Sequence, residues 1–153
     1  MKVIEVAGLA DYVGKELGAS DWFQIDQERI NAFADATLDH QFIHVDPEQA
    51  RSTPFGTTIA HGYLTLSLLP YRQASIDDIL MPKGMKMAMN YGFDKLRFMA
   101  PVKEGKRIRA RATLLETTEK REGQWLLKFA FTVDIEGEDK PALAAEWLLM
   151  YFV

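Results

Sequence analysis

An aspartate and a histidine with four residues between them are the side chains best suited to chemistry in this sequence. Asp39 and His44 lie between two segments with helical patterns, so a short loop can bring the carboxylate and the imidazole together. Histidine titrates near neutral pH and a carboxylate can hold a water molecule, so the pair suits general acid–base catalysis. The spacing alone is weak, because a capping aspartate and a structural histidine give the same pattern. His40 is interpreted as pointing away from the pair.

A second feature is the segment Ile59-Ala60-His61-Gly62, which begins an apolar helical pattern. The first N–H groups of a helix have no partner within it and lie at the positive end of its dipole. Gly62 would let a substrate approach that backbone closely. The helix start can therefore bind a carbonyl oxygen that becomes negative in a transition state. His61 is interpreted more simply, as a first-turn residue with a local hydrogen bond.

Three helix starts position these residues. Asp26 is a good N-cap for a helix over about 27–37, which delivers Asp39 just past its end. Asp46-Pro47 begins a second helix, which the breakers at 52–56 keep short. The third helix begins at His61-Gly62 and is apolar almost all round, which predicts burial. Pro70 should kink or split it, because proline removes a backbone donor.

From Met85 onward the hydrophobic period changes to two, which predicts strands joined by turns. The strand 107–114 points four apolar residues to one side, namely Ile108, Ala110, Ala112 and Leu114. The strand 125–135 does the same, and ALAAEWLLMYFV ends the chain as a largely buried strand. Three or four long antiparallel strands after a buried helix predict an α+β domain with a sheet wrapped around one long central helix. The exposed edges of such a sheet favour a homodimer that pairs edge to edge.

The composition excludes several classes of protein. The chain has no cysteine, so disulfides and cysteine-ligated metals are excluded. A net charge of -4 argues against nucleic acid as a partner. The longest apolar run, WLLMYFV, is far short of the roughly 20 residues that span a bilayer, and the N-terminal segment does not read as a signal peptide. We therefore expect a cytoplasmic protein with no membrane partner, no bound metal and no redox cofactor.

The segment from Asp39 to Gly62 resembles the hydratase motif of the MaoC-like family, the (R)-specific enoyl-CoA hydratases of hot-dog fold. Asp39 and His44 stand at the two catalytic places of the motif, and IAHG stands at 59–62. The later segment NYGFDKLRFMAPVKEG resembles the strand and turn of that family. The family's Asn-Pro is Gln41-Phe42 here, which together with IHVDPE is similar to the nodulation protein N-like branch and leaves the acyl substrate open. The resemblance implies a single hot-dog hydratase domain over 1–153.

The resemblance also implies roles for individual residues. Asp39 and His44 would hold the water that adds to C3 of a trans-2-enoyl thioester and would manage the proton at C2. The Gly62 N–H would bind the thioester oxygen, and the product would be an (R)-3-hydroxyacyl thioester. No cofactor is implied, because the coenzyme A or acyl carrier protein thioester is itself the substrate. Further substrate-binding candidates are Ser67, which a bond to its own helix backbone would explain equally well, and Gln41 and Asn90.

Three interpretations stay open beside these roles. Asn90 is interpreted as a buried amide that needs a partner. The stripe Arg107, Arg109 and Arg111 is interpreted as the solvated face of a strand, with contact to the phosphates of coenzyme A as the alternative. A third group is interpreted as filling gaps in the core or lining an acyl pocket, namely Met81, Met85, Met87 and Met89.

Two other functions compete with a hydratase. A hot-dog acyl-CoA thioesterase would direct the same water at the carbonyl carbon instead of C3. A non-catalytic acyl-thioester-binding protein would keep the fold without the chemistry. The combination of Asp39, His44 and Gly62 favours an enzyme, because a binding protein does not need it.

Overall fold

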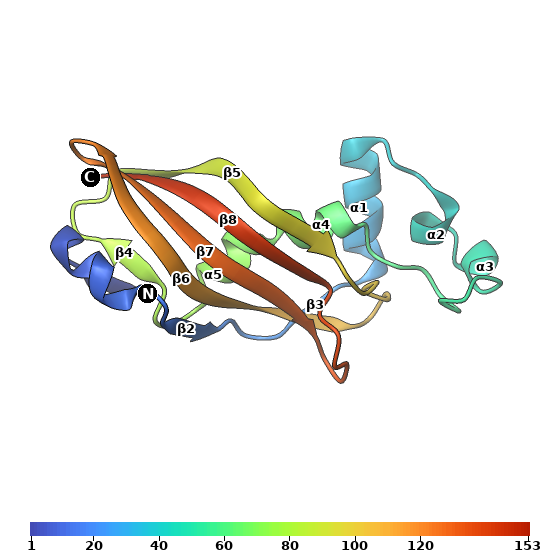
Figure 1. Ribbon diagram of the computed structural model, residues 1–153. Coiled ribbons are helices and arrows are strands. Elements are labelled where there is room, and N and C mark those ends of the chain that lie inside the picture. The colour runs from blue at the N-terminus through green and yellow to red at the C-terminus, as the bar shows by residue number, and fades with distance from the viewer.

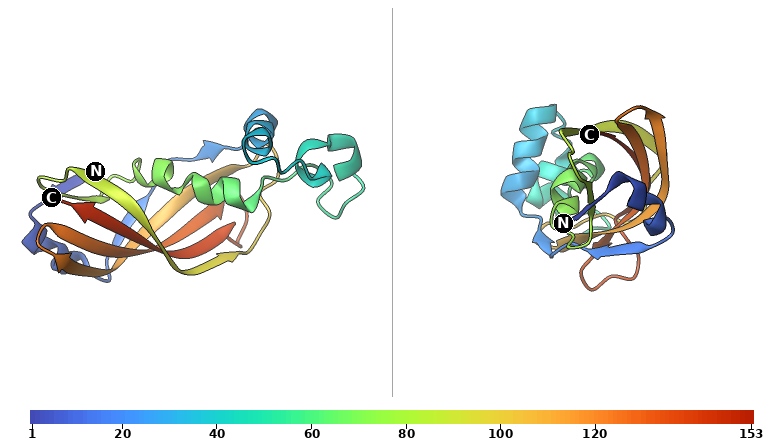
Figure 2. Two further views of the ribbon diagram at one scale, coloured as in Figure 1. Left: turned by 90° about the horizontal axis from the view of Figure 1, so that it is seen from above. Right: turned by 90° about the vertical axis from the view of Figure 1, so that its left-hand side faces the viewer.

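A curved antiparallel sheet wraps around two short central helices in the computed structural model, which describes residues 1–153 (Figure 2). The strand order is β2-β6-β7-β8-β5, and β3 also pairs with β6. The central helices are α4 (Gly62–Ser67) and α5 (Leu69–Gln73). The expected α+β hot-dog architecture is thereby confirmed.

Four long strands make most of the sheet, namely β5 (Met87–Phe98), β6 (Arg107–Arg121), β7 (Gln124–Ile135) and β8 (Leu143–Phe152). Short strands β2 (Glu16–Ala19) and β3 (Phe23–Gln24) extend it beside β6. The predicted alternation in β6 and β7 is confirmed, because the inward residues from Ile108 to Leu114 and from Leu127 to Ile135 are buried. Outside this sheet, β1 (Lys2–Ile4) pairs in parallel with β4 (Leu80–Pro82), and η1 (Val6–Tyr12) is a 3-10 helix.

The central helix is split, as the proline predicted. Leu68 ends α4 and caps α5, and Pro70 lies in the first turn of α5, where its missing N–H costs no hydrogen bond. The expectation that this segment is buried almost all round is wrong for the single chain. Tyr63 is 66% exposed and Tyr71 is 56% exposed. The sheet covers only one side of the two helices, so the other side stays open.

Three helices form an arm that lies beyond the end of the sheet (Figure 1). The helix α1 (Gln27–Thr37) begins at Asp26, whose side chain accepts a hydrogen bond from the Arg29 N–H at 2.8 Å. It ends at Leu38, a left-handed residue with φ of 63°. The helices α2 (Phe42–Val45) and α3 (Pro47–Ala50) follow, and Asp46 caps α3. The predicted helix starts at Asp26 and Asp46 are confirmed, and Asp39 emerges between α1 and α2.

The edge strand β5 is exposed along most of its length. Met87 is 48% exposed and Met89 is 51% exposed, so the expectation that they fill gaps in the core is wrong. Asn90 is exposed too, and the expected buried amide is not there. The physical reason is that β5 pairs only with β8, so nothing in this chain covers its free side.

The arginine stripe on β6 lies against carboxylates. Arg109 reaches Asp134 at 3.0 Å, Arg111 reaches Glu16 at 3.0 Å, and Arg107 pairs with Glu136. Each cation is therefore already paired, which supports the solvated-face interpretation over a phosphate site.

None of the helices has the length and the apolar character that crossing a membrane would require.

Candidate active site

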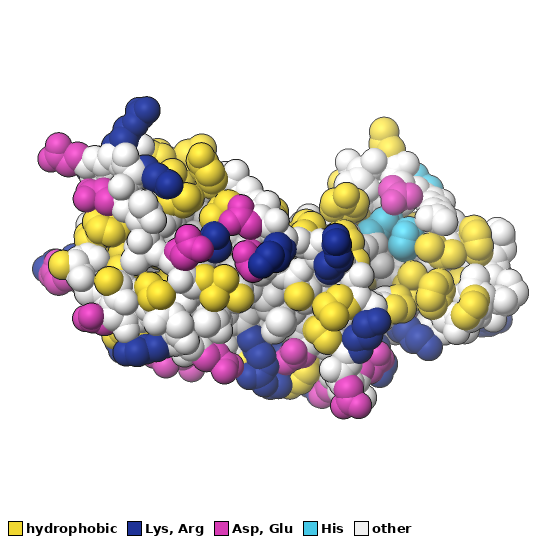
Figure 3. Space-filling model, in the orientation of Figure 1, with side chains coloured by type: hydrophobic (Ala, Val, Ile, Leu, Met, Phe, Trp, Pro, Cys, Tyr) yellow, Lys and Arg dark blue, Asp and Glu magenta, His cyan; other side chains and the backbone are white.

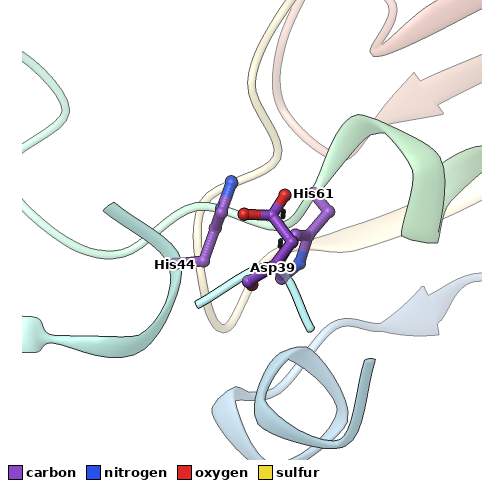
Figure 4. Close-up of side chains that lie close together, drawn as sticks. All are labelled: Asp39, His44 and His61. Atoms are coloured by element: carbon purple, nitrogen blue, oxygen red, sulfur yellow. Dashed lines mark hydrogen bonds and ion pairs between the residues drawn. The ribbon is translucent and has the colours of Figure 1, made fainter. Parts of the chain in front are cut away.

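Asp39, His44 and His61 converge from three segments of the chain (Figure 4). Each offers one nitrogen or oxygen atom, and these atoms all lie within 4.8 Å of one another. His44 comes from α2 and is 7% exposed, and His61 caps α4 and is 3% exposed. The Asp39 side chain is 56% exposed. The structure thus brings the predicted pair together, with one partner buried and one open to water.

The His44 ring is held in one tautomer. Its Nδ1 lies 2.7 Å from the Ile59 carbonyl oxygen, which can only accept, so Nδ1 carries the proton and Nε2 offers a lone pair. Burial lowers the pKa of His44 below its ordinary value of 6.5, and the neighbouring His61 acts in the same direction. The bond to Ile59 and the charge of Asp39 oppose that shift. His44 is therefore suited to accept a proton at neutral pH.

A glutamine at the start of α1 anchors the backbone of this segment. The side-chain amide of Gln27 donates to the His44 carbonyl oxygen at 2.7 Å. The amide oxygen of Gln27 accepts from the Thr58 hydroxyl, and Thr58 is 1% exposed. One side chain therefore ties α1, α2 and the segment before α4 together.

The other two histidines differ in their surroundings. The Nε2 atom of His61 lies 2.9 Å from the Asp39 carbonyl oxygen, 22 residues away in the sequence. The prediction of a hydrogen bond within the first turn of the helix is therefore wrong. The ring of His61 stacks on His44, with centroids 3.8 Å apart and planes 25° apart. His40 instead reaches Asp35 at 2.8 Å on the surface, which confirms that it points away.

A cavity of about 280 Å³ opens beside His44. Figure 3 shows histidine atoms at the surface near the base of the helical arm, beside an acidic side chain. Gly62 and Thr65 of α4 line one side of the cavity, and residues 98–102 line another. Gly62 is the first residue of α4, so its N–H has no acceptor within the helix. The cavity is therefore lined both by a proton acceptor, His44, and by the unpaired N–H at the start of α4.

The geometry of the three convergent residues does not fit a metal ion. The lone pairs of an imidazole lie in its ring plane, and the stacked rings of His44 and His61 lie in nearly parallel planes 3.8 Å apart. Two such nitrogens cannot both point at one ion at about 2.0–2.1 Å. The arrangement instead suits one buried base, His44, beside the Asp39 carboxylate.

The remaining predicted residues lie away from this cavity. Ser67 and Asn90 line a second cavity of about 310 Å³ together with Trp147, between the central helices and β5. Gln41 is exposed at the N-cap of α2. The structure thus brings Ser67 and Asn90 together but does not bring them or Gln41 into the cavity beside His44.

Sequence reasoning missed three residues that shape the site, namely Gln27, Thr58 and Phe98. The contact of Gln27 with His44 crosses 17 residues, so no local pattern in the sequence indicates it. The ring of Phe98 lines the cavity and was hidden in a strand pattern. The family resemblance of the segment around Phe98 was the one signal that pointed to its neighbourhood.

The chain is similar to known dehydratases over most of its length. The family described as MaoC like domain matches residues 9–130. The 3-hydroxyacyl-thioester dehydratase Z of Mycobacterium tuberculosis is 49% identical over 95% of this chain and 95% of that protein. Nodulation protein N of Rhizobium leguminosarum bv. viciae is 46% identical over 97% of this chain and 91% of that protein. The structure of an R-hydratase from Pseudomonas aeruginosa has a TM-score of 0.66 and 25% identity, covering 91% of this chain and 81% of that one.

Proposed function

The chain belongs to the MaoC-like domain family, and on that premise we propose that it is an (R)-specific enoyl-thioester hydratase/dehydratase, a hydro-lyase. It adds water reversibly to a trans-2-enoyl thioester and gives an (R)-3-hydroxyacyl thioester. The observation that carries the proposal is the convergence of Asp39 and His44, the latter at the wall of a cavity that also reaches Gly62. Its relatives include a 3-hydroxyacyl-thioester dehydratase and an R-hydratase, which supports the same reaction class.

His44 and Asp39 act on one water molecule in this proposal. The lone pair of His44 Nε2 accepts a proton as the water oxygen bonds to C3 of the substrate. The electrons of the C2–C3 double bond move toward the thioester carbonyl and form an enolate. C2 then takes a proton from the Asp39/His44 pair, so one water is added and no electrons are gained or lost. No redox cofactor is required by that balance.

The Gly62 N–H is proposed to bind the thioester oxygen while it carries negative charge. A donor fixed at a helix start needs no reorganisation when the charge develops. Gly62 lines the same cavity as His44, which supports a substrate whose carbonyl lies beside the reacting C2–C3 bond. Ser67 and Asn90 are kept as proposed contacts to a more distant part of the substrate, and Gln41 as one at the rim.

The decisive experiment follows two bonds at once. Purified protein is given crotonyl to dodecenoyl thioesters on coenzyme A and on acyl carrier protein, while enoyl absorbance and free thiol are both recorded. The hydratase proposal expects loss of enoyl absorbance with no thiol release. Thiol release would favour the thioesterase, and tight binding without either signal would favour the acyl-thioester-binding protein.

We also propose that the protein is a homodimer. The edge strand β5 exposes Met87, Met89 and Tyr91, and the open side of the central helices exposes Tyr63 and Tyr71. A long exposed edge strand with apolar side chains is a site for pairing with another chain. Pairing of two copies through β5 would cover that edge.

Two broader expectations stay predictions. We propose that residues 1–153 act as one domain, which is supported by a buried core that joins residues from Leu9 to Tyr151. The expected cytoplasmic location is part of the same proposal. Fractionation of cells that express the tagged chain would test it.

A further inference from the structure

His61 occupies a place that the reaction proposed above does not use. It is 3% exposed and, like Asp39, does not line the cavity beside His44. It nevertheless touches both members of the acid–base pair. Its Nε2 lies 2.9 Å from the Asp39 carbonyl oxygen, and its ring stacks on His44 at 3.8 Å.

The hydrogen bonds assign the tautomer of His61. The Asp39 carbonyl oxygen can only accept, so Nε2 of His61 carries the proton. Nδ1 of His61 is buried and has no hydrogen-bond partner. A lone pair at that position leaves no donor unsatisfied, whereas an N–H there would be a buried donor without an acceptor. His61 therefore donates through Nε2 and presents a lone pair at Nδ1.

Few contacts within its own loop fix the position of Asp39. It follows the left-handed Leu38, and its side chain is largely exposed. Its carboxylate has two long contacts, with the Gln41 N–H at 3.4 Å and with Nε2 of His61 at 4.0 Å. The bond from His61 to the Asp39 carbonyl oxygen connects this loop to the buried start of α4. On its other side the His61 ring packs against Phe33 of α1, with centroids 5.0 Å apart. His61 is thus held by its own packing and can fix the position of the Asp39 loop.

We propose that His61 is a positioning residue that sets the separation between the Asp39 carboxylate and the His44 imidazole. Its N–H fixes the backbone of Asp39, and its ring face fixes the plane of His44. The inference rests on the proposed function for its catalytic consequence, but the geometry can be tested without turnover. A misplacement of about 1 Å in such a pair can lower the rate by up to about 10²-fold.

Two variants separate the two contacts. In His61→Gln a side-chain amide can still donate to Asp39 but offers no ring face to His44. In His61→Phe the ring face remains but the donor is lost. His40→Gln is the matched control, because His40 bonds only to the exposed Asp35. The kcat and KM for crotonyl-CoA hydration are measured for each variant over a range of pH, per folded molecule.

We expect kcat to fall about 10- to 10²-fold in both His61 variants while KM changes little, and the control to match wild type. In His61→Gln we also expect the acid limb of the kcat/KM profile to move to higher pH, since loss of the stacked ring would expose His44 to water and relieve the burial that lowers its pKa. A purely structural role would lower the folded fraction without moving the profile. Unchanged kcat per folded molecule in both variants would overturn the proposal.

A measurement on the wild-type protein keeps the outcome separate from the proposed function. Nitrogen NMR of the histidine rings reports which nitrogen of each ring carries the proton, with or without any turnover. The proposal expects the Nε2–H tautomer for His61 and the Nδ1–H tautomer for His44. An Nδ1–H tautomer at His61 would contradict the bond to Asp39 and end the proposal even if the enzyme is a hydratase. If no enoyl thioester is hydrated, the function fails while the tautomer result still stands.

Discussion

The ring of Phe98 occupies the space that a side chain at Gly62 would need. A Cβ atom added to Gly62 would lie 2.9 Å from Cδ1 of Phe98, closer than such atoms pack. Phe98 itself is 46% exposed and stacks edge-on against Tyr63 at 5.5 Å. Glycine at this position thus leaves room for the Phe98 ring as well as for an approaching substrate.

This relationship sharpens the test of the oxyanion role. We expect Gly62→Val to lower turnover by about 10²–10³-fold, the usual cost of losing one such donor interaction. The protein should stay folded, because Phe98 is a half-exposed side chain that can move aside. Turnover and melting temperature are measured together.

A second variant removes the contact with Phe98 from the comparison. Gly62→Val is combined with Phe98→Ala, and Phe98→Ala alone is the control. If the double variant melts like the control but stays inactive, blocked access to the Gly62 N–H explains the loss. Recovery of turnover in the double variant would assign the effect to the displaced ring instead.

The acid–base pair gives the second prediction. We expect Asp39→Asn and His44→Gln each to lower hydration turnover by about 10²–10⁴-fold. That loss corresponds to roughly 2.7–5.4 kcal/mol of activation free energy. The double variant should lose much less than the product of the single losses, because groups acting on one water work as a unit. Near-wild-type turnover in folded His44→Gln would contradict the assignment directly.

The pH dependence of stability gives the third prediction. Because burial lowers the pKa of His44, the unfolded chain binds a proton that the folded chain does not bind just below pH 6.5. The free energy of unfolding should therefore fall as the pH drops below about 6.5. Above that pH, protonation of His44 no longer lowers it. Melting temperatures at about pH 7.5 and about pH 5 should differ less in His44→Gln than in wild type. An equal acid sensitivity in both proteins would place the titrating group elsewhere.

The proposed dimer gives the fourth prediction. Light scattering at micromolar concentration should give twice the chain mass of 17.4 kDa. Met89→Lys and Tyr91→Lys should each shift the protein toward the monomer, since a charge would be placed on the paired edge. Val3→Lys is the control, because Val3 is 56% exposed but lies on β1, outside the main sheet. A monomeric wild type would remove the dimer without affecting the chemistry.

Local patterns were predictable from the sequence. Asp26 and Asp46 cap the helices that they were expected to begin, because a capping bond joins residues three positions apart. The inward residues of β6 and β7 followed from alternation, since both strands lie inside the sheet with one face on the core. The Asp39 and His44 pair was found because a short loop confines the two side chains.

Contacts between distant segments were not predictable. Asn90 and Met89 are exposed because β5 is an edge strand, and a period of two cannot tell an edge strand from a central one. The role of His61 depends on a bond that crosses 22 residues. Gln27 joins segments 17 and 31 residues away through one amide. No local pattern in the sequence indicates such long-range contacts.

Leu38 has a consequence for how far this protein can be stabilised. A leucine at φ of 63° costs about 1–2 kcal/mol in backbone strain, and its side chain is 82% exposed and so recovers little by burial. Leu38→Gly should raise stability by about 0.5–1 kcal/mol once the entropy of glycine is counted. The same change would free the backbone next to Asp39, so we expect lower turnover at a higher melting temperature. Thermal stability and catalytic rate would then be in opposition at the residue that precedes Asp39, and variants selected for heat resistance alone should lose activity there first.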